Sequence, residues 1–122
     1  MSKNLRKGLR FEDQASSYLQ AHGLLLLHSN YRCRFGELDL VMRDGDTLCF
    51  VEVKFRKSLL FGGAAASIPP TKQRKIIKTA LFYIASHKHL ANMAMRFDAL
   101  LIQHQADGGN RINWIQNAFY AE

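Results

Sequence analysis

The segment from Leu48 to Arg56 limits the possible fold more than any other part of the 122-residue chain. Side chains along a β-strand alternate between two faces. One face of this segment is wholly apolar and consists of Cys49, Val51, Val53 and Phe55. The other face begins with Leu48 and Phe50 and then becomes charged at Glu52, Lys54 and Arg56. The pattern predicts a strand with one buried face, whose other face reaches the rim of a cleft at Glu52.

Hydrophobic periodicity and turn residues predict the other elements around this strand. The expected elements are, in chain order, a helix over 8–22 that ends at Gly23, strands over 24–31, 37–43 and 47–55, a helix over 71–86, and strands over 96–104 and 111–115. Asp44-Gly45-Asp46 is typical of a hairpin turn, and residues 61–70 are typical of a loop because small residues dominate them. The fold class is therefore α/β, with a mixed central sheet flanked by helices in the order αβββαββ.

The length of the chain suits a single domain over residues 1–122. Seventeen Lys and Arg against ten Asp and Glu give a net charge of +7, and such a field attracts polyanions, of which nucleic acid is the commonest. Basic composition alone also occurs in proteins that bind no nucleic acid.

No apolar run approaches the roughly 20 residues of a membrane-spanning helix, and no apolar signal core follows the basic first residues. We therefore expect a cytoplasmic protein without a membrane partner. Cys33 and Cys49 are too few for a disulfide scaffold, and the apolar neighbours of Cys49 predict a buried thiol.

Two acids on neighbouring strands predict a metal site. Glu37 and Asp39 share one face of the second strand, opposite Leu38, Leu40 and Met42, and the tight hairpin brings Asp39 within reach of Glu52. Carboxylates that meet repel each other unless a cation lies between them. Oxygen ligands suit Mg²⁺ or Mn²⁺, and Lys54 faces the same cleft, where it can offset charge on a phosphate.

Simpler interpretations of these residues remain open. Asp39 or Glu52 can form a surface cross-strand ion pair with Lys54. Glu12 falls on or beside the buried face of the first helix, where a carboxylate is costly without a partner. It can also be an edge residue that reaches solvent, or a favourable charge near the helix N-terminus.

The sequence resembles the bacterial YraN family (UPF0102), which is related to Holliday-junction resolvases and to the PD-(D/E)XK nuclease superfamily. The resemblance covers nearly the whole chain and rests on Glu12, on Gly36-Glu37-Leu38-Asp39 and on Phe50-Val51-Glu52-Val53-Lys54-Phe55-Arg56. It implies a restriction-endonuclease-like core. The family usually has a glycine before the helix acid, and Phe11 in its place is expected to shift Glu12.

The resemblance also assigns roles to single residues. It implies that Asp39 and Glu52 bind the metal together with the Val53 carbonyl, and that Lys54 and Glu12 take part in catalysis. Glu37 is expected to act behind the metal-binding acids. Apart from the resemblance, positive charge on the second helix and at the end of the third strand indicates the residues expected to bind nucleic acid, which are Lys72, Arg74, Lys75, Lys78 and Arg56.

These observations favour a metal-dependent endonuclease that hydrolyses nucleic-acid phosphodiesters, with DNA favoured over RNA and branched DNA in repair or recombination as a candidate substrate. The alternative is a non-catalytic or partner-dependent nucleic-acid-binding module with the same fold. An intact set of acids and lysine favours the enzyme. A homodimer is a further expectation, with an edge strand or Leu59–Phe61 as its candidate interface.

Overall fold

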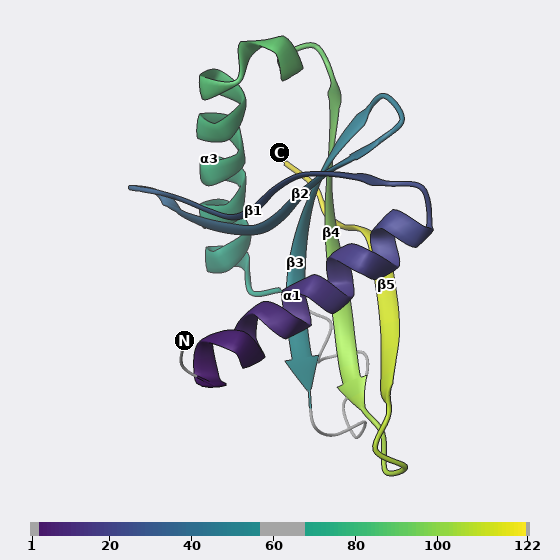
Figure 1. Ribbon diagram of the computed structural model, residues 1–122. Coiled ribbons are helices and arrows are strands. Elements are labelled where there is room, and N and C mark those ends of the chain that lie inside the picture. The colour runs from purple at the N-terminus through teal and green to yellow at the C-terminus, as the bar shows by residue number, and fades with distance from the viewer. Residues whose placement is uncertain (1–2, 57–67, 122) are drawn as a thin grey trace.

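The computed structural model describes residues 3–56 and 68–121 (Figure 1). Its elements are, in chain order, α1 (Lys3–Ala21), β1 (Leu25–Cys33), β2 (Gly36–Asp44), β3 (Thr47–Arg56), α3 (Pro70–Ser86), the short 3-10 helix η1 (Lys88–Leu90), β4 (Ala94–His104) and β5 (Asn110–Phe119). The predicted order of helices and strands is confirmed. Of the loop predicted over 61–70, residues 61–67 lie outside the described residues, and α3 already begins at Pro70.

Two elements extend at least four residues beyond their predicted bounds. Helix α1 begins at Lys3 instead of residue 8, and β5 continues past residue 115 to Phe119. The pairing of β5 with β4 shifts register between Phe97 and Ala99, and Asn117 adopts a φ of 54° in this region. Asparagine tolerates positive φ better than most residues. Because of this irregularity, apolar and polar residues do not alternate regularly at the end of β5, so the sequence pattern does not predict where the strand ends.

The five strands form one mixed sheet in the order β1-β2-β3-β4-β5. Strands β3 and β4 are parallel, and each of the other neighbouring pairs is antiparallel. Parallel neighbours need a long crossover connection, and α3 lies within the connection between β3 and β4. The α/β class with a mixed central sheet is confirmed.

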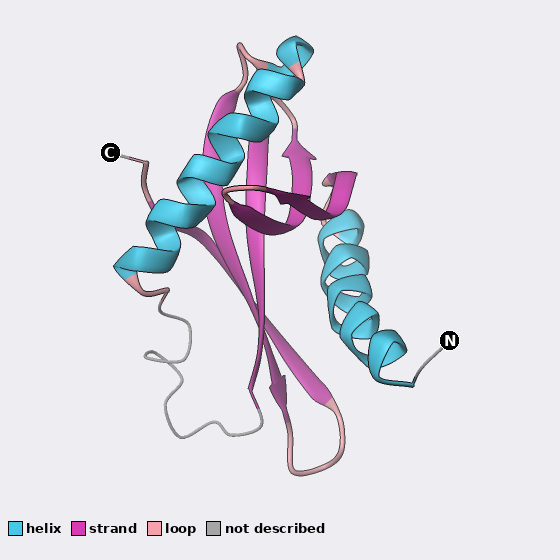
Figure 2. Ribbon diagram, turned by 90° about the vertical axis from the view of Figure 1, so that its left-hand side faces the viewer, coloured by secondary structure: helices cyan, strands magenta, loops and turns pink. Residues whose placement is uncertain are grey.

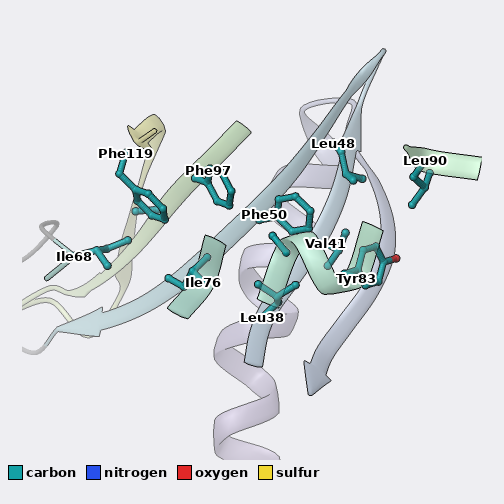
Figure 3. Close-up of a cluster of buried hydrophobic side chains, with 12 residues drawn as sticks. Leu38, Val41, Leu48, Phe50, Ile68, Ile76, Tyr83, Leu90, Phe97 and Phe119 are labelled. Carbon is teal, nitrogen blue, oxygen red and sulfur yellow. The ribbon is translucent and has the colours of Figure 1, made fainter. Parts of the chain in front are cut away.

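Helices α1 and α3 cover opposite faces of the sheet (Figure 2). On the α3 side, Phe50 stacks on Phe97 with ring centroids 5.5 Å apart (Figure 3). On the α1 side, Leu19 packs in a core with Cys49 and Val51. The predicted alternation of β3 is therefore confirmed, and so is the burial of Cys49. Full burial of a side chain as large as Phe50 contributes about 1.5–3 kcal/mol to stability.

Strand β1 is one edge of the sheet, and it exposes apolar side chains at Leu25, Leu26 and Leu27. The segment 59–61, the other candidate for a dimer interface, lies outside the described residues. No helix within the described part of the chain is both long enough and apolar enough to cross a membrane.

Candidate active site

Strands β2 and β3 stop pairing beside two acidic residues. Their last paired residues are Leu40 and Val51. One further step along the antiparallel register sets Asp39 opposite Glu52. The structure thus brings together the two acids that the sequence analysis places on neighbouring strands.

The alternation of β2 breaks at Asp39. The sequence pattern predicts one shared face for Leu38, Leu40 and Met42, and this prediction is wrong. Leu38 packs in the core on the α3 side, whereas Leu40 and Met42 pack in the core on the α1 side. The reason is that β1 and β2 curve away from β3 toward α3 in this region (Figure 1). Asp39 lies at the turning point and is directed at β3.

The backbone of Val53 fixes the orientation of Asp39. Its N–H group donates a hydrogen bond of 2.8 Å to Asp39 Oδ2. In an extended strand the N–H and C=O groups of one residue point to the same side. The Val53 carbonyl therefore faces the side of β3 from which β2 has separated, where it is available as an oxygen donor next to Asp39.

Glu52 is buried, with 8% of its surface exposed, and contacts charges of both signs. Its Oε1 atom lies 2.7 Å from Lys72 Nζ at the start of α3, and its carboxyl group also forms a hydrogen bond with that of Asp39. Burial, followed by the charge of Asp39, raises the pKa of Glu52 to about 7, although Lys72 acts in the opposite direction. Burial and the neighbouring Asp39 carboxyl group therefore both favour the protonated form of Glu52.

Burial also raises the pKa of Asp39, against the opposing effect of the Val53 N–H group, which stabilises the carboxylate. The charge of Glu37 adds to this increase. Glu37 itself is exposed and forms an ion pair with Arg32, with Oε2 3.1 Å from Nε. It influences the site through its charge, and it lines the neighbouring cleft.

Helix α1 contributes Glu12 from the other face of the sheet. Burial, and next the charge of Asp39, raises the pKa of Glu12, although a hydrogen bond with the Asn30 side chain lowers it. The other carboxyl oxygen, Oε2, is buried without a hydrogen-bond partner. Phe11 stacks on Phe55 at the end of β3, with ring centroids 4.2 Å apart. The bulky residue before Glu12 therefore anchors this part of α1 on β3.

Asn30 is a site neighbour that sequence reasoning missed. It has a φ of 55° in β1 and hydrogen-bonds the Glu12 carboxyl group. An asparagine inside an apolar strand pattern is a signal for such a conformation, but it does not identify the partner across the sheet.

Lys54 follows Glu52 by two residues on β3 and is half-buried. Burial lowers the pKa of Lys54, and the positive charges of Arg56 and Lys72 lower it further, while Glu52 raises it. These couplings place the Lys54 ammonium group among the charged groups of the site. Arg56 donates a hydrogen bond of 2.9 Å to the Phe55 carbonyl at the end of the strand.

A cleft of about 420 Å³ lies between the start of β2 and the start of α3. It is lined by Gly36, Glu37, Glu52, Pro69, Thr71, Lys72, Lys75 and Ile76. Of the basic residues predicted on α3, the structure places Lys72 and Lys75 in this cleft. Lys78 lies farther along the helix, with its Nζ atom 5.6 Å from the ring centre of Phe35. Arg74 is exposed and does not line the cleft.

The donor groups of this site fit a hard divalent cation. Within residues 3–56 and 68–121, no group of three or more His, Cys, Asp or Glu side chains forms a metal site by itself. Magnesium sites, however, typically use one or two carboxylates and complete their shell with substrate and water. Asp39, Glu52 and the Val53 carbonyl supply such a set. Burial is the largest cause of the raised pKa of all three acids, and Glu12 Oε2 is buried without a hydrogen-bond partner, so a bound cation would stabilise the ionised carboxylates.

A second charged group, on the other side of β3, is structural. Asp98 is fully buried and accepts hydrogen bonds from Trp114 Nε1 and from the Asn117 N–H, each 3.0 Å long. Arg96 binds Asp98 with Nε at 2.9 Å from Oδ1, and its Nη1 lies 3.1 Å from Asp44 Oδ2. With its partners supplied by β2, β4 and β5, this network ties the strands together. Its members are far apart in sequence, so spacing alone did not reveal it.

The fold and the site together define an α/β domain whose mixed sheet carries paired acids and a lysine at the point where two strands separate. The chain belongs to the UPF0102 family, since the model of the "Uncharacterised protein family UPF0102" matches residues 11–102. The matched range contains all of the candidate site residues from Glu12 to Lys78.

Individual relatives agree with this assignment. A UPF0102 protein of Nitrosomonas eutropha is 52% identical over 119 residues, which cover 98% of this chain and 97% of that protein. A UPF0102 protein of Nitrosomonas europaea is 50% identical over 119 residues, covering 98% of each chain. A UPF0102 protein of Pseudomonas putida is 44% identical over 114 residues, covering 93% of this chain and 92% of its own. The similarity therefore extends over nearly the full length of this chain.

Proposed function

We propose that this protein is a metal-dependent nuclease that hydrolyses phosphodiester bonds in DNA. The observation that carries the proposal is the meeting of Asp39, Glu52 and the Val53 backbone where β2 separates from β3. Burying two adjacent carboxyl groups is costly, and a purely structural role would be served better by apolar residues. The arrangement is best accounted for by a cation-binding role.

Mg²⁺ or Mn²⁺ would be held by Asp39, Glu52 and the Val53 carbonyl, because both ions accept oxygen donors of this kind. When bound, such an ion supplies a Lewis acid for the phosphate and lowers the pKa of the water that attacks it. Asp39 and Glu52 would hold the ion as carboxylates, since metal ligands must be deprotonated.

The remaining groups of the site stabilise the phosphate or accept the proton of the attacking water. Lys54 supplies a positive charge two residues from Glu52, which offsets the charge that develops on the phosphate in the transition state. Glu12 supplies a carboxylate with a raised pKa, and this makes it a better proton acceptor near neutral pH than an ordinary glutamate. Lys72 and Lys75 line the cleft beside these groups and bind the neighbouring phosphates.

The net charge of +7 supports a polyanionic substrate. The relation of the family to Holliday-junction resolvases favours branched DNA, in repair or recombination, over an intact duplex. A dimer would allow cleavage of two strands of a junction, and the exposed edge strand β1 is the described surface that suits such a contact.

One observation favours a second candidate function, a nucleic-acid-binding module without cleavage. The Lys72 ammonium group lies 2.7 Å from Glu52 and already compensates part of the acid charge without a metal. A module of this kind would use Lys72 and Lys75 as structural cations facing a phosphate backbone. Its binding would weaken steeply with salt, as would that of the nuclease, so only cleavage distinguishes the two.

The test is a cleavage assay on end-labelled single-stranded, duplex, flapped and four-way-junction DNA, titrated with Mg²⁺ and Mn²⁺. Asp39→Ala and Glu52→Ala are compared with Asp46→Ala, which removes an exposed acid in the β2–β3 turn. We expect metal-dependent cleavage that the first two substitutions abolish and the third preserves. Cleavage that persists in a chelator or in Asp39→Ala contradicts the proposed mechanism. Tight binding of these DNAs without cleavage favours the binding module.

A further inference from the structure

Aromatic rings and cations meet where the β1–β2 turn touches α3. Phe35, in the turn, packs edge-on against Phe82 of α3, with ring centroids 5.5 Å apart. The guanidinium carbon of Arg34 lies 4.9 Å from the Phe35 ring centre, and Lys78 Nζ lies 5.6 Å from it. Both rings are half-buried, and both cations are exposed. We call Arg34, Phe35, Lys78 and Phe82 the aromatic patch.

The position of the patch is fixed by close backbone packing. Gly36 follows Phe35 with a φ of +149°, and a Cβ atom built on it would lie 3.0 Å from Thr79 Oγ1 on α3. Only glycine permits so close an approach at this φ. The turn is therefore held against the helix, and the rings of Phe35 and Phe82 are kept together before any ligand binds.

The aromatic patch continues into the cleft of the proposed active site. Lys72, Lys75, Thr79 and Phe82 are spaced by three or four residues, so they follow one face of α3. Lys72 and Lys75 line the cleft together with Gly36, the residue after Phe35. The ten residue steps from Lys72 to Phe82 correspond to about 15 Å of helix. Stacked nucleotides of one strand rise about 3.4 Å each along the helix axis, so this length matches about four of them.

The positive charges of the aromatic patch favour the binding of an anion. Arg34 and Lys78 approach the same ring and repel each other, and among the described residues neither forms an ion pair with a carboxylate. A phosphate group compensates both charges, while a nucleobase stacks on aromatic rings and on guanidinium groups. The bases of an intact duplex are paired and stacked inside it, so only unpaired bases can make this contact.

We propose that the aromatic patch binds unpaired bases of a DNA strand whose backbone follows Lys75 and Lys72 toward Asp39 and Glu52. The inference rests on the proposed function for the chemistry at the acids, and it adds a substrate class: DNA in which a single-stranded segment adjoins the phosphodiester to be cut. Stacking uses the faces of the bases, which all bases have, so this contact tolerates different sequences.

The first test measures binding by fluorescence polarisation in a chelator, so that no cleavage is required. The DNAs are a blunt duplex and the same duplex with a single-stranded overhang. Phe35→Leu and Phe82→Leu should each weaken overhang binding about tenfold, the effect of losing 1.4 kcal/mol of stacking, and should leave duplex binding within about twofold. Tyr18→Leu is the matched control, because Tyr18 is a half-buried aromatic residue of α1 on the other face of the sheet.

The second test uses the unmodified protein, so it does not depend on the folding of a variant. An overhang that carries 5-iodouracil is photo-crosslinked to the protein, and mass spectrometry maps the attached peptides. Crosslinks at Phe35 or Phe82 support the proposal. Overhang binding that both phenylalanine substitutions leave unchanged overturns it, and so do crosslinks that map only to other segments.

The two proposals fail separately. If the protein binds the overhang through Phe35 and Phe82 but cuts no DNA, the proposed role of the aromatic patch stands and the proposed nuclease function is wrong. If cleavage depends on the metal and on Asp39, but Phe35→Leu and Phe82→Leu bind the overhang normally, the proposed nuclease function stands. The proposed role of the aromatic patch is then wrong.

Discussion

Lys72 Nζ lies 2.7 Å from Glu52 Oε1, so a side chain from the first turn of α3 places a positive charge in the acid cluster. The glutamate side chain is 9% exposed and the lysine side chain 50%. The lysine is therefore free to swing out toward solvent, whereas the glutamate stays in place. This relationship makes Lys72 a competitor of any cation that binds Glu52.

Removing this competitor should strengthen metal binding. We expect Lys72→Gln to bind Mn²⁺ several-fold more tightly than the wild type, because the metal no longer displaces an ammonium group. Isothermal titration with Mn²⁺ in the absence of DNA measures the effect. Lys75→Gln is the control, since Lys75 lines the same cleft without an ion pair to Glu52. Unchanged or weaker Mn²⁺ binding by Lys72→Gln would show that the ion pair does not occupy the metal position.

The raised pKa of Glu52 predicts how stability depends on pH. Its pKa is about 7 in the folded protein, against an ordinary value of 4.5, so between these values the folded state binds more protons than the unfolded chain. The free energy of unfolding contributed by this group therefore falls as the pH rises through this window. Glu52→Gln does not titrate, so its stability relative to the wild type should increase by on the order of 3 kcal/mol as the pH rises from 4.5 to about 7.

Urea unfolding in a chelator at about pH 5 and about pH 8 measures this difference for the wild type and for Glu52→Gln. Asp46→Asn, in the exposed β2–β3 turn, is the control. A stability difference between Glu52→Gln and the wild type that stays constant, or that shrinks as the pH rises, contradicts the raised pKa of Glu52.

Gly36 should be required for the junction between β2 and α3. Gly36→Ala places a methyl group 3.0 Å from Thr79 Oγ1 at a φ that favours glycine, and we expect it to lower the free energy of unfolding by more than about 1 kcal/mol. Gly45→Ala also has a positive φ, of +59°, but meets nothing within 4 Å. Chemical denaturation should show the larger loss for Gly36→Ala. Equal losses would mean that the contact with Thr79 carries no energy.

The Asp98 network should matter for folding and not for cleavage. Asp98→Ala leaves Trp114 Nε1 and part of Arg96 without partners inside the sheet, and breaking a buried ion pair of this kind costs about 3–5 kcal/mol. Asp44→Ala removes the outer partner of Arg96. The Asp44 side chain is 39% exposed, so its loss should lower the free energy of unfolding by less than about 1 kcal/mol. Thermal melting of both variants checks the order. A similar loss in both would contradict the central role of Asp98.

Much of the fold could be predicted because β3 and the two helices follow simple periodic patterns. Glu52 and Lys54 could be assigned to a charged face because their neighbours on β3 alternate regularly. Regular alternation fails on β2, since the strand twists between Leu38 and Leu40 as it follows α3. A local pattern contains no information on such a tertiary bend.

The sequence pattern could predict the acids of the candidate site, but not the residues that contact them. The hairpin register brings Asp39 to Glu52 through a contact between neighbouring strands. The partners of these acids come from distant segments: Lys72 from α3, Glu12 from α1 and Asn30 from β1. The approach of Phe35 to Phe82 is equally hidden, because it depends on how closely the turn packs on α3.

Asp39 and Glu52 are proposed to form a metal-dependent catalytic site. The most direct test is the single-turnover cleavage rate of a labelled DNA flap in Mg²⁺, with Asp39→Asn compared with the wild type. The two proteins have nearly the same shape, and only the charge of the side chain differs. We predict cleavage by the wild type and a rate at least about 100-fold lower in Asp39→Asn, the scale of losing a main electrostatic group in a catalytic site. Cleavage by Asp39→Asn at the wild-type rate would exclude a catalytic role for the Asp39 carboxylate.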